Sequence, residues 1–384
     1  MNCFAICWKN KQISLEELKL VWHTNIRFYN ASFFTFDMEE KNEKLLYQLW
    51  WLIKWGRIVE YWDLKDLLQD VKIIWSNDKW LWDQLKSDKI VRRYKNVSMQ
   101  HTDLEIKKKW KELIRIWSVI WLVLWYQNIS LYEDIDFGKP ARSMNMWMMP
   151  AKLAHILINI ALNKIENWNI EILSFVHQDK KYDGQKSNNT NMFTSFHFSS
   201  FPYCIYDPFV WSWTTGFLAN YMWFDFLWSD KNIEYVKKNY NWWKTTKRHQ
   251  NNNFFEIFQQ DIFKPLDVRE KYLESMLIVT EWRLWPIVTQ KTDWNQIKLF
   301  QQEVLKLYQA FLNNISNLFK TNNIKLPTMV FTIPYYINQN NFIESDLKSL
   351  STKLWRKFNS VEEIYAREWQ FVGRKIVILN SCNS

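Results

Sequence analysis

Residues 206–230 read YDPFVWSWTTGFLANYMWFDFLWSD, and this stretch decides the fold of the region around it. An apolar strand runs into Asp207, a short turn leads to a helix that starts near Thr214, and a second apolar strand ends at Asp230. Parallel strands need a crossover connection of this kind, because the chain must return to the same end of the sheet before the next strand begins. The stretch therefore predicts two parallel strands joined by a helix.

Tryptophan stands where such a turn needs glycine, at Trp211 and Trp213, and the composition repeats this signal. The chain has 26 Trp and only 5 Gly among 384 residues, whereas an average chain of this length has about 7% Gly, or roughly 27. Turns and helix caps need residues that tolerate positive φ. We infer that many printed tryptophans stand for glycine, as in a genetic code that reads UGA as glycine. The alternative is a genuinely Trp-rich binder of carbohydrate or of a lipid interface.

With glycine at 211, 213, 223 and 228 the stretch reads DPFVGSGTTGFLANYMGFDFLGSD. This string resembles the nucleotide loop of S-adenosylmethionine-dependent amino-methyltransferases. The resemblance implies an acidic residue facing the methionyl amine, free N–H groups at a helix start, and a second acidic residue on the ribose hydroxyls. A nicotinamide-binding loop is the alternative, which the DPF before the turn disfavours. The residues so assigned to the cofactor are Asp207, Trp211, Trp213, Thr214, Thr215, Gly216, Asp230 and, further along, Asp261 for the adenine amino group.

The segment at 280–286 occupies the place of the catalytic motif of this class. The class carries D/N-P-P-Y/F there, whereas this chain reads TEWRLWP, or TEGRLGP with glycine restored. The usual first acceptor and the aromatic residue are both absent. We expect Glu281 to accept hydrogen bonds from an exocyclic amine and Arg283 to stack on the base. Thr280 is the next candidate for the acceptor.

Four segments extend the resemblance to the THUMP-associated tRNA guanosine-N2 methyltransferases and their bacterial relatives. They are residues 3–21, 49–54, 127–162 and 365–379. The third is the most specific, because Lys139, Pro140 and Arg142 match a Lys/Arg-Pro-Arg segment, and residues 147–154 match Gly-Met-x-Pro-x-Lys-Leu-Ala once Trp147 is read as glycine. The resemblance implies an RNA-binding region, a catalytic domain, and tRNA or another structured RNA as partner, with Arg142 on the RNA.

The N-terminal region, residues 1–135, reads as a small α+β domain related to THUMP domains. Its sequence VRRYK at 91–95 supplies a basic cluster of Arg92, Arg93 and Lys95. The formal net charge of +10 also favours a polyanionic partner. We expect the cluster to contact RNA phosphates, with an ordinary solvated surface as the alternative.

Residues 136–384 read as a Rossmann-like α/β methyltransferase domain. A helix at 148–162 precedes apolar strand runs at 204–210, 222–230, 254–261, 276–281, 328–334 and 375–380, with a long amphipathic helix at 294–320. Apolar strands separated by helices predict a mostly parallel sheet. EWQFV and RKIVILN, separated only by Gly373, predict a closing antiparallel hairpin, and the polar stretch at 180–200 predicts an inserted surface loop.

Several function classes are disfavoured. The four cysteines and six histidines show no metal-ligand spacing, so we expect reduced thiols, no metal and a cytoplasmic location. The first residues lack the basic region, apolar core and small-residue cleavage site of a signal peptide, so we expect none. The longest apolar run, at 114–126, falls short of the roughly 20 residues that span a bilayer. The rival function is a DNA amino-methyltransferase of a modification system, since the order of loop and catalytic motif is shared. The N-terminal half, however, does not resemble a DNA target-recognition domain.

Overall fold

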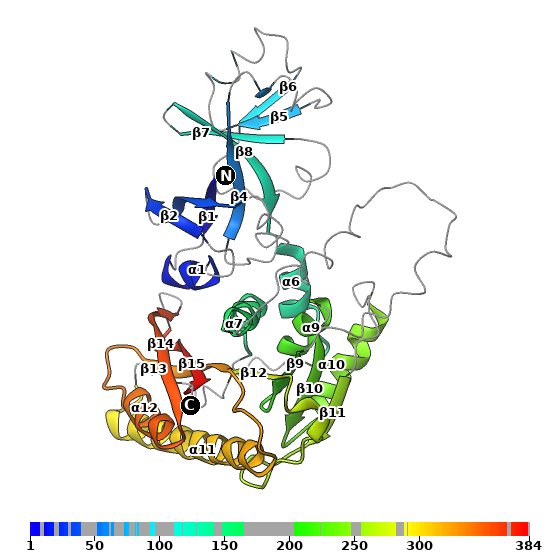
Figure 1. Ribbon diagram of the computed structural model, residues 1–384, viewed down its shortest axis with the longest axis vertical. Helices are drawn as coiled ribbons and strands as arrows, with labels where there is room; N and C mark the ends of the chain where they lie inside the picture. The colour runs from blue at the N-terminus through cyan, green and yellow to red at the C-terminus, as the bar shows by residue number, and fades with distance from the viewer. Residues whose placement is uncertain are drawn as a thin grey trace. The chain divides into compact units, whose positions relative to one another are not determined.

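The computed structural model describes residues 1–7, 11–18, 23–29, 32–39, 52–60, 63–64, 73–76, 81, 83, 93–96, 111–116, 118–127, 129–141, 148–164, 203–222, 224–246, 255–281, 288–289, 291–366 and 370–382. The chain divides into two compact units, residues 1–129 and 130–384 (Figure 1). Each unit has its own sheet.

The first unit is built on an eight-stranded mixed sheet in the order β2-β3-β1-β4-β8-β7-β5-β6. Its elements are β1 (Asn2–Cys7), α1 (Lys11–Leu18), β2 (His23–Phe28), β3 (Phe33–Met38), β4 (Leu52–Val59), β5 (Ile73–Ser76), β6 (Arg93–Asn96), β7 (Lys111–Ile116) and β8 (Val119–Tyr126). The apolar run at 114–126 therefore belongs to two neighbouring antiparallel strands, β7 and β8. Phe4, Phe33 and Trp121 pack together in the core of this unit.

The second unit is a Rossmann-like α/β domain with a seven-stranded sheet in the order β11-β10-β9-β12-β13-β15-β14. Its strands are β9 (Cys204–Asp207), β10 (Asp225–Asp230), β11 (Phe255–Gln259), β12 (Met276–Glu281), β13 (Met329–Tyr336), β14 (Arg356–Tyr365) and β15 (Val372–Ser381). The first five strands are parallel, whereas β15 runs antiparallel to both β13 and β14. The predicted mostly parallel sheet with a closing antiparallel hairpin is confirmed.

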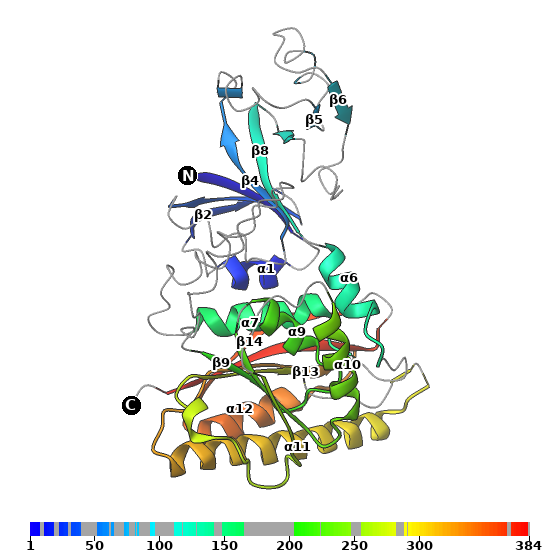
Figure 2. The same ribbon diagram turned by 90° about the vertical axis from the view of Figure 1, so that its right-hand side faces the viewer.

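Helices cover both faces of this sheet (Figure 2). One face carries α7 (Ala151–Asn163), α9 (Thr214–Tyr221) and α10 (Glu234–Thr245), and the other carries α11 (Trp294–Thr321) and α12 (Ile343–Lys353). A further helix, α6 (Ile129–Phe137), lies where the two units meet in sequence. The predicted helices at 148–162 and 294–320 correspond to α7 and α11.

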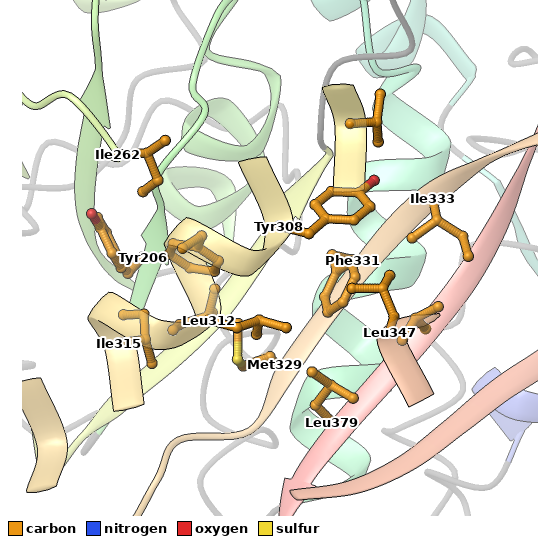
Figure 3. Packing of buried hydrophobic residues seen from close by; sticks show 14 of the residues in the cluster. Tyr206, Ile262, Tyr308, Leu312, Ile315, Met329, Phe331, Ile333, Leu347 and Leu379 are labelled. Carbon is orange, nitrogen blue, oxygen red and sulfur yellow. The ribbon is translucent and has the colours of Figure 1, made fainter. Parts of the chain in front are cut away.

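A large hydrophobic core lies between the sheet and α11 (Figure 3). Tyr308, Leu312 and Ile315 recur at the three- and four-residue spacing of one helix face. They pack against residues of the strands, including Tyr206 and Phe331. Burial of this stripe fixes α11 on the sheet, and so holds the carboxyl ends of the parallel strands in register.

The closing hairpin is built from other residues than the sequence predicted. Its first strand is β14, and of the described part of the predicted EWQFV, residues 370–372, only Val372 lies in a strand. Gly373 lies inside β15 opposite Tyr335 and is not in the turn. A Cβ at Gly373 would lie 2.4 Å from Ile364 Cγ2. Glycine is therefore needed there for close packing between strands. The prediction that Gly373 forms the turn of the hairpin is wrong.

Three predicted site residues, Arg92, Arg142 and Arg283, and the predicted loop at 180–200 lie outside the described residues. Within the part of the chain that the structure describes, no helix is both long and apolar enough to cross a membrane. The same part contains no group of three His, Cys, Asp or Glu residues placed to hold a metal ion.

Candidate functional site

Acidic residues mark the carboxyl ends of four neighbouring parallel strands in the second unit. Asp207, Asp230 and Glu281 are the last residues of β9, β10 and β12, and Asp261 follows β11 by two residues. All four line one cavity of about 420 Å³, together with the start of α9. This volume lies within the roughly 300–1,000 Å³ of small-molecule sites. The cavity opens where the strand order reverses direction, which is the usual ligand position in open α/β sheets.

Asp207 is buried at the centre of the site, with 2% of its surface exposed. Its Oδ1 accepts hydrogen bonds from Thr280 Oγ1 at 2.6 Å and from the Phe209 backbone N–H at 3.1 Å, and its Oδ2 accepts one from Thr215 Oγ1 at 2.8 Å. Burial raises the pKa of this carboxyl to about 6, although the three hydrogen bonds oppose the shift. Asp207 thus ties β9, β12 and the first turn of α9 together.

Lys139 supports the same helix start from the segment that follows α6. Its side chain is buried, and its Nζ donates to Thr214 Oγ1 at 2.8 Å and to Ser212 Oγ at 3.4 Å. Ser212 and Thr214 both line the cavity and lie 3.1 Å apart, oxygen to oxygen. The sequence marked Lys139 only as part of a family segment, and the 75 positions between Lys139 and Thr214 hid their contact.

Trp213 stands just before α9 in the left-handed conformation, with φ of 63°. Its indole is fully buried, and its ring centroid lies 4.4 Å from those of Phe217 and Trp228. The indole also lies directly over Gly216, where a Cβ would be 1.9 Å from Trp213 Nε1. Trp211 is half-buried and packs on Tyr235 at 4.8 Å between ring centroids. Aromatic side chains therefore fill the space beside the turn that the sequence assigns to the cofactor.

Asp230 and Asp261 are half-buried at the outer part of the cavity. Asp230 Oδ1 accepts a hydrogen bond from the Asn232 backbone N–H at 2.9 Å, and Asp261 Oδ1 accepts one from the Phe263 N–H at 3.1 Å. Asp261 Oδ2 also lies 3.8 Å from Lys231 Nζ. These short turns fix each carboxylate at the end of its strand while leaving it part of the cavity wall.

Glu281 is buried on the opposite side of the cavity, with 8% of its surface exposed. Its Oε1 accepts hydrogen bonds from Arg374 Nε and, at 3.5 Å, from Thr332 Oγ1. Its Oε2 forms no hydrogen bond with any residue that the structure describes. Thr280 turns the other way and donates to Asp207, and it is not part of the cavity wall.

Arg374 is a site residue that the sequence analysis missed. It lies on β15 and is 2% exposed, and its Nη2 also donates to the Met148 carbonyl at 3.4 Å. It thereby joins Glu281 to the segment that leads into α7. The available signal was a charged residue next to the apolar run IVIL of its strand, because a buried charge needs a partner. Its partner, however, lies 93 positions away in sequence.

The predicted RNA cluster is only partly described. Arg93 and Lys95 lie in β6, an edge strand of the first unit, where β6 pairs in parallel with β5. Arg92 and Arg142 lie outside the described ranges. The basic cluster remains a prediction.

No protein-family model matches the chain, and no curated protein matches it either. Solved structures with a similar arrangement include TrmN from Thermus thermophilus, at 10% identity and a TM-score of 0.42, covering 99% of each chain. A protein from Listeria monocytogenes, predicted to be an N6-adenine-specific DNA methylase, matches at 9% identity and a TM-score of 0.37, covering 98% of this chain and 95% of that one.

Magnesium protoporphyrin IX methyltransferase from Synechocystis PCC 6803, solved with bound S-adenosylmethionine, is also similar. It matches at 9% identity and a TM-score of 0.30, covering 46% of this chain and 69% of that one.

Proposed function

We propose that this chain is an S-adenosylmethionine-dependent methyltransferase that acts on the exocyclic N2 amine of a guanosine in tRNA. The observation that carries the proposal is the row of four acidic strand ends, Asp207, Asp230, Asp261 and Glu281, around one cavity beside the start of α9. No single acidic residue would suffice, since a lone carboxylate at a strand end is common. Four on adjacent parallel strands match the three polar parts of the cofactor and leave one for the substrate.

The residues present fit this cofactor. Asp207 suits the methionyl amine, which would contribute a positive charge to a buried carboxylate. Asp230 suits the two ribose hydroxyls and Asp261 the adenine amino group, because carboxylate oxygens only accept hydrogen bonds when ionised. The first turn of α9 adds N–H groups that have no partner within the helix. When bound, S-adenosylmethionine supplies an electrophilic methyl group on its sulfonium.

Glu281 is our candidate for the residue that orients the substrate amine. Arg374 and Thr332 engage Oε1, so Oε2 is the oxygen proposed to accept from the substrate amine. An amine that donates its hydrogens to this oxygen keeps its lone pair for the methyl group. The transfer then depends on positioning and on a site that excludes water. Arg283 is proposed to stack on the base, and Thr280 to act through Asp207 as a positioning residue.

The first unit is proposed to bind the RNA, as a THUMP-related domain within residues 1–135, with residues 136–384 as the catalytic domain. Neutralising Arg92, Arg93 and Lys95 together should weaken tRNA binding and lower the slope of affinity against salt by up to about three phosphate contacts. An unchanged slope would assign the cluster to ordinary surface. Arg142 is expected to add a further phosphate contact.

We also infer that many printed tryptophans are glycine in the native protein. Trp213 and Trp355 have φ of 63° and 56°, and the other non-glycine residues with positive φ among those described are all Asn. The indole Nε1 atoms of Trp121, Trp213 and Trp228 are buried and have no hydrogen-bond partner among the residues that the structure describes. Both features cost free energy, and glycine would remove both.

The test uses two full-length proteins, one as printed and one with glycine at 211, 213, 223 and 228. Calorimetry measures S-adenosylmethionine binding, and labelled methyl transfer is measured on unmodified tRNA and on duplex DNA. We expect the glycine-restored chain to bind the cofactor and to form N2-methylguanosine in tRNA. Transfer to DNA adenine or cytosine alone would support the rival DNA methyltransferase. Absence of cofactor binding by both proteins would refute the methyltransferase.

A further inference from the structure

A second cavity of the second unit lies at the amino ends of the parallel strands β12 and β13. It has a volume of about 1170 Å³ and is lined by Met276 and Leu277, at the start of β12, and by Thr328, just before β13. The candidate cofactor cavity is instead lined by residues at the carboxyl ends of the parallel strands. No residue that the structure describes lines both cavities. The second cavity is therefore a separate feature of the domain.

Arg356 is the most informative residue of its wall. This first residue of β14 is 2% exposed, and its Nη1 donates to the Pro327 carbonyl at 2.9 Å. Its Nε and Nη2 are buried and have no hydrogen-bond partner among the described residues. These two donors lie on the same edge of the guanidinium, the edge that binds a carboxylate or phosphate through two parallel hydrogen bonds. Burial lowers the pKa of Arg356 to about 10, so the group stays charged at neutral pH.

Lysines surround this buried guanidinium. Lys348, Lys353 and Lys357 line the cavity, are exposed, and form no ion pair with any residue that the structure describes. Lys164 and Lys325 line it as well, and Glu274 is the one acidic residue in the described wall. The wall thus carries a large excess of positive charge. Such a concentration is unfavourable unless an anion neutralises it.

We propose that this cavity binds a phosphate group, with Arg356 as the two-pronged anchor and the lysines as the charged rim. Arginine in a fixed position selects for a planar or tetrahedral oxyanion, and several lysines favour an anion of more than one charge over a single carboxylate. The phosphate can belong to a free phosphorylated small molecule or to an RNA backbone. The proposal does not depend on the methyltransferase activity, because it uses none of the residues of the other cavity.

The first experiment follows thermal unfolding of the full chain in increasing inorganic phosphate, against sodium chloride of equal ionic strength. Phosphate stabilises many proteins without binding to a site, so the comparison is between variants. We expect a saturating rise of Tm for the wild type. Arg356→Met should abolish the saturating rise without lowering Tm in chloride, because it removes a buried charge that has no anion to pair with.

A second variant keeps the test decisive if Arg356→Met does not fold. Lys353→Ala with Lys357→Ala should weaken phosphate binding by roughly threefold to tenfold, as expected for exposed charges. The matched control is Lys298→Ala with Lys306→Ala, which removes two exposed lysines of α11 outside this cavity and should leave binding unchanged. Equal phosphate responses in all these proteins, or a full response in Arg356→Met, would overturn the proposal.

Binding of tRNA distinguishes the two sources of phosphate. If the lysine pair lowers the slope of tRNA affinity against salt by about two while the control pair does not, the ligand is an RNA backbone phosphate. If the tRNA slope is unchanged and inorganic phosphate still needs Arg356, the ligand is a small phosphorylated molecule. Both results support the site.

Discussion

Thr280 on β12 and Asp207 on β9 are joined by a hydrogen bond of 2.6 Å between their side chains. These strands are neighbours in the sheet although β10 and β11 intervene in sequence. The bond therefore closes the site at the point where the strand order reverses. Because both groups are buried, the protonation of Asp207 affects the stability of the whole domain.

We predict that Asp207→Asn changes how stability depends on pH. The pKa of this carboxyl is about 6 in the folded protein, against an ordinary value of 3.8. Between these values the folded state holds the proton and the unfolded state does not, so the stability that Asp207 contributes is full below pH 3.8 and is lost as pH rises to about 6. The free energy of unfolding of the wild type, minus that of Asp207→Asn, should fall across this window and level off above pH 7. A difference that is constant with pH would contradict the assigned pKa.

The Glu281–Arg374 pair should show strong coupling. Removing either partner alone leaves a buried charge, so Glu281→Ala and Arg374→Met should each cost about 3–5 kcal/mol of unfolding free energy. The double variant Glu281→Ala/Arg374→Met should lose less than the sum of the two, since neither charge remains. Denaturant unfolding measures the coupling, and additive losses would show that the contact does not act as a pair.

The same variants separate stability from chemistry. Glu281→Gln keeps an oxygen that accepts hydrogen bonds, so single-turnover methyl transfer should be lowered only in part, whereas Glu281→Ala should be much slower. Cofactor affinity should change little in either variant. A full transfer rate in Glu281→Ala would move the acceptor to another group.

Asp230→Ala should raise the Kd for S-adenosylmethionine by at least about tenfold, because hydrogen bonds to a charged carboxylate contribute roughly 1.5–3 kcal/mol each. Its effect on tRNA affinity should be small. Asp267→Ala is the matched control. Asp267 is an exposed carboxylate in the segment that follows β11, and it does not line the cavity. Calorimetry measures the affinity of both variants for S-adenosylmethionine in the glycine-restored protein. Equal affinities of Asp230→Ala and Asp267→Ala would exclude Asp230 from the ribose site.

Lys139 should matter for the amino acid part of the cofactor only. Its two hydroxyl partners accept from Nζ, so a proton on Ser212 or Thr214 is left to donate toward the cavity. Lys139→Met should weaken the binding of S-adenosylhomocysteine by about tenfold, which is the effect expected when one charge-assisted hydrogen bond is lost. Methylthioadenosine, which lacks the amino acid group, should bind both proteins alike. An equal loss for both ligands would indicate a general defect of the loop.

The native protein should carry glycine at 213 and tryptophan at 243. Trp213 combines positive φ with a buried indole N–H that has no partner in the described part of the chain, whereas Trp243 Nε1 donates to Asn220 Oδ1 at 2.8 Å. Mass spectrometry of peptides from the protein made in its own host reads both positions directly. In the printed chain, Trp243→Gly should cost at least about 3–5 kcal/mol through the cavity it leaves. Tryptophan at 213 in the native peptide would refute the recoding.

Local patterns predicted the parallel strands well, because each of these strands is a short apolar run that ends in an acidic or polar residue. The stretch at 206–230 needed only its own neighbours to predict β9, α9 and β10. Contacts such as Arg374 with Glu281, or Lys139 with Thr214, depend on the strand order and on the path of the chain before α7. Those are set by packing over the whole domain, which no local pattern contains. Gly373 was misread because a need for close packing and a need for a turn select the same residue.

The strand β15 follows every other strand in sequence and yet lies between β13 and β14. As a ribosome extends the chain, β13 and β14 emerge with open edges that only residues 372–381 can close. Until then, both edges can pair with other chains, which is a route to aggregation. Arg374 arrives with this strand, so Glu281 gains its ionic partner only when the sheet is completed. Release of a prematurely terminated chain would therefore yield a protein with neither a finished sheet nor an assembled Glu281–Arg374 pair.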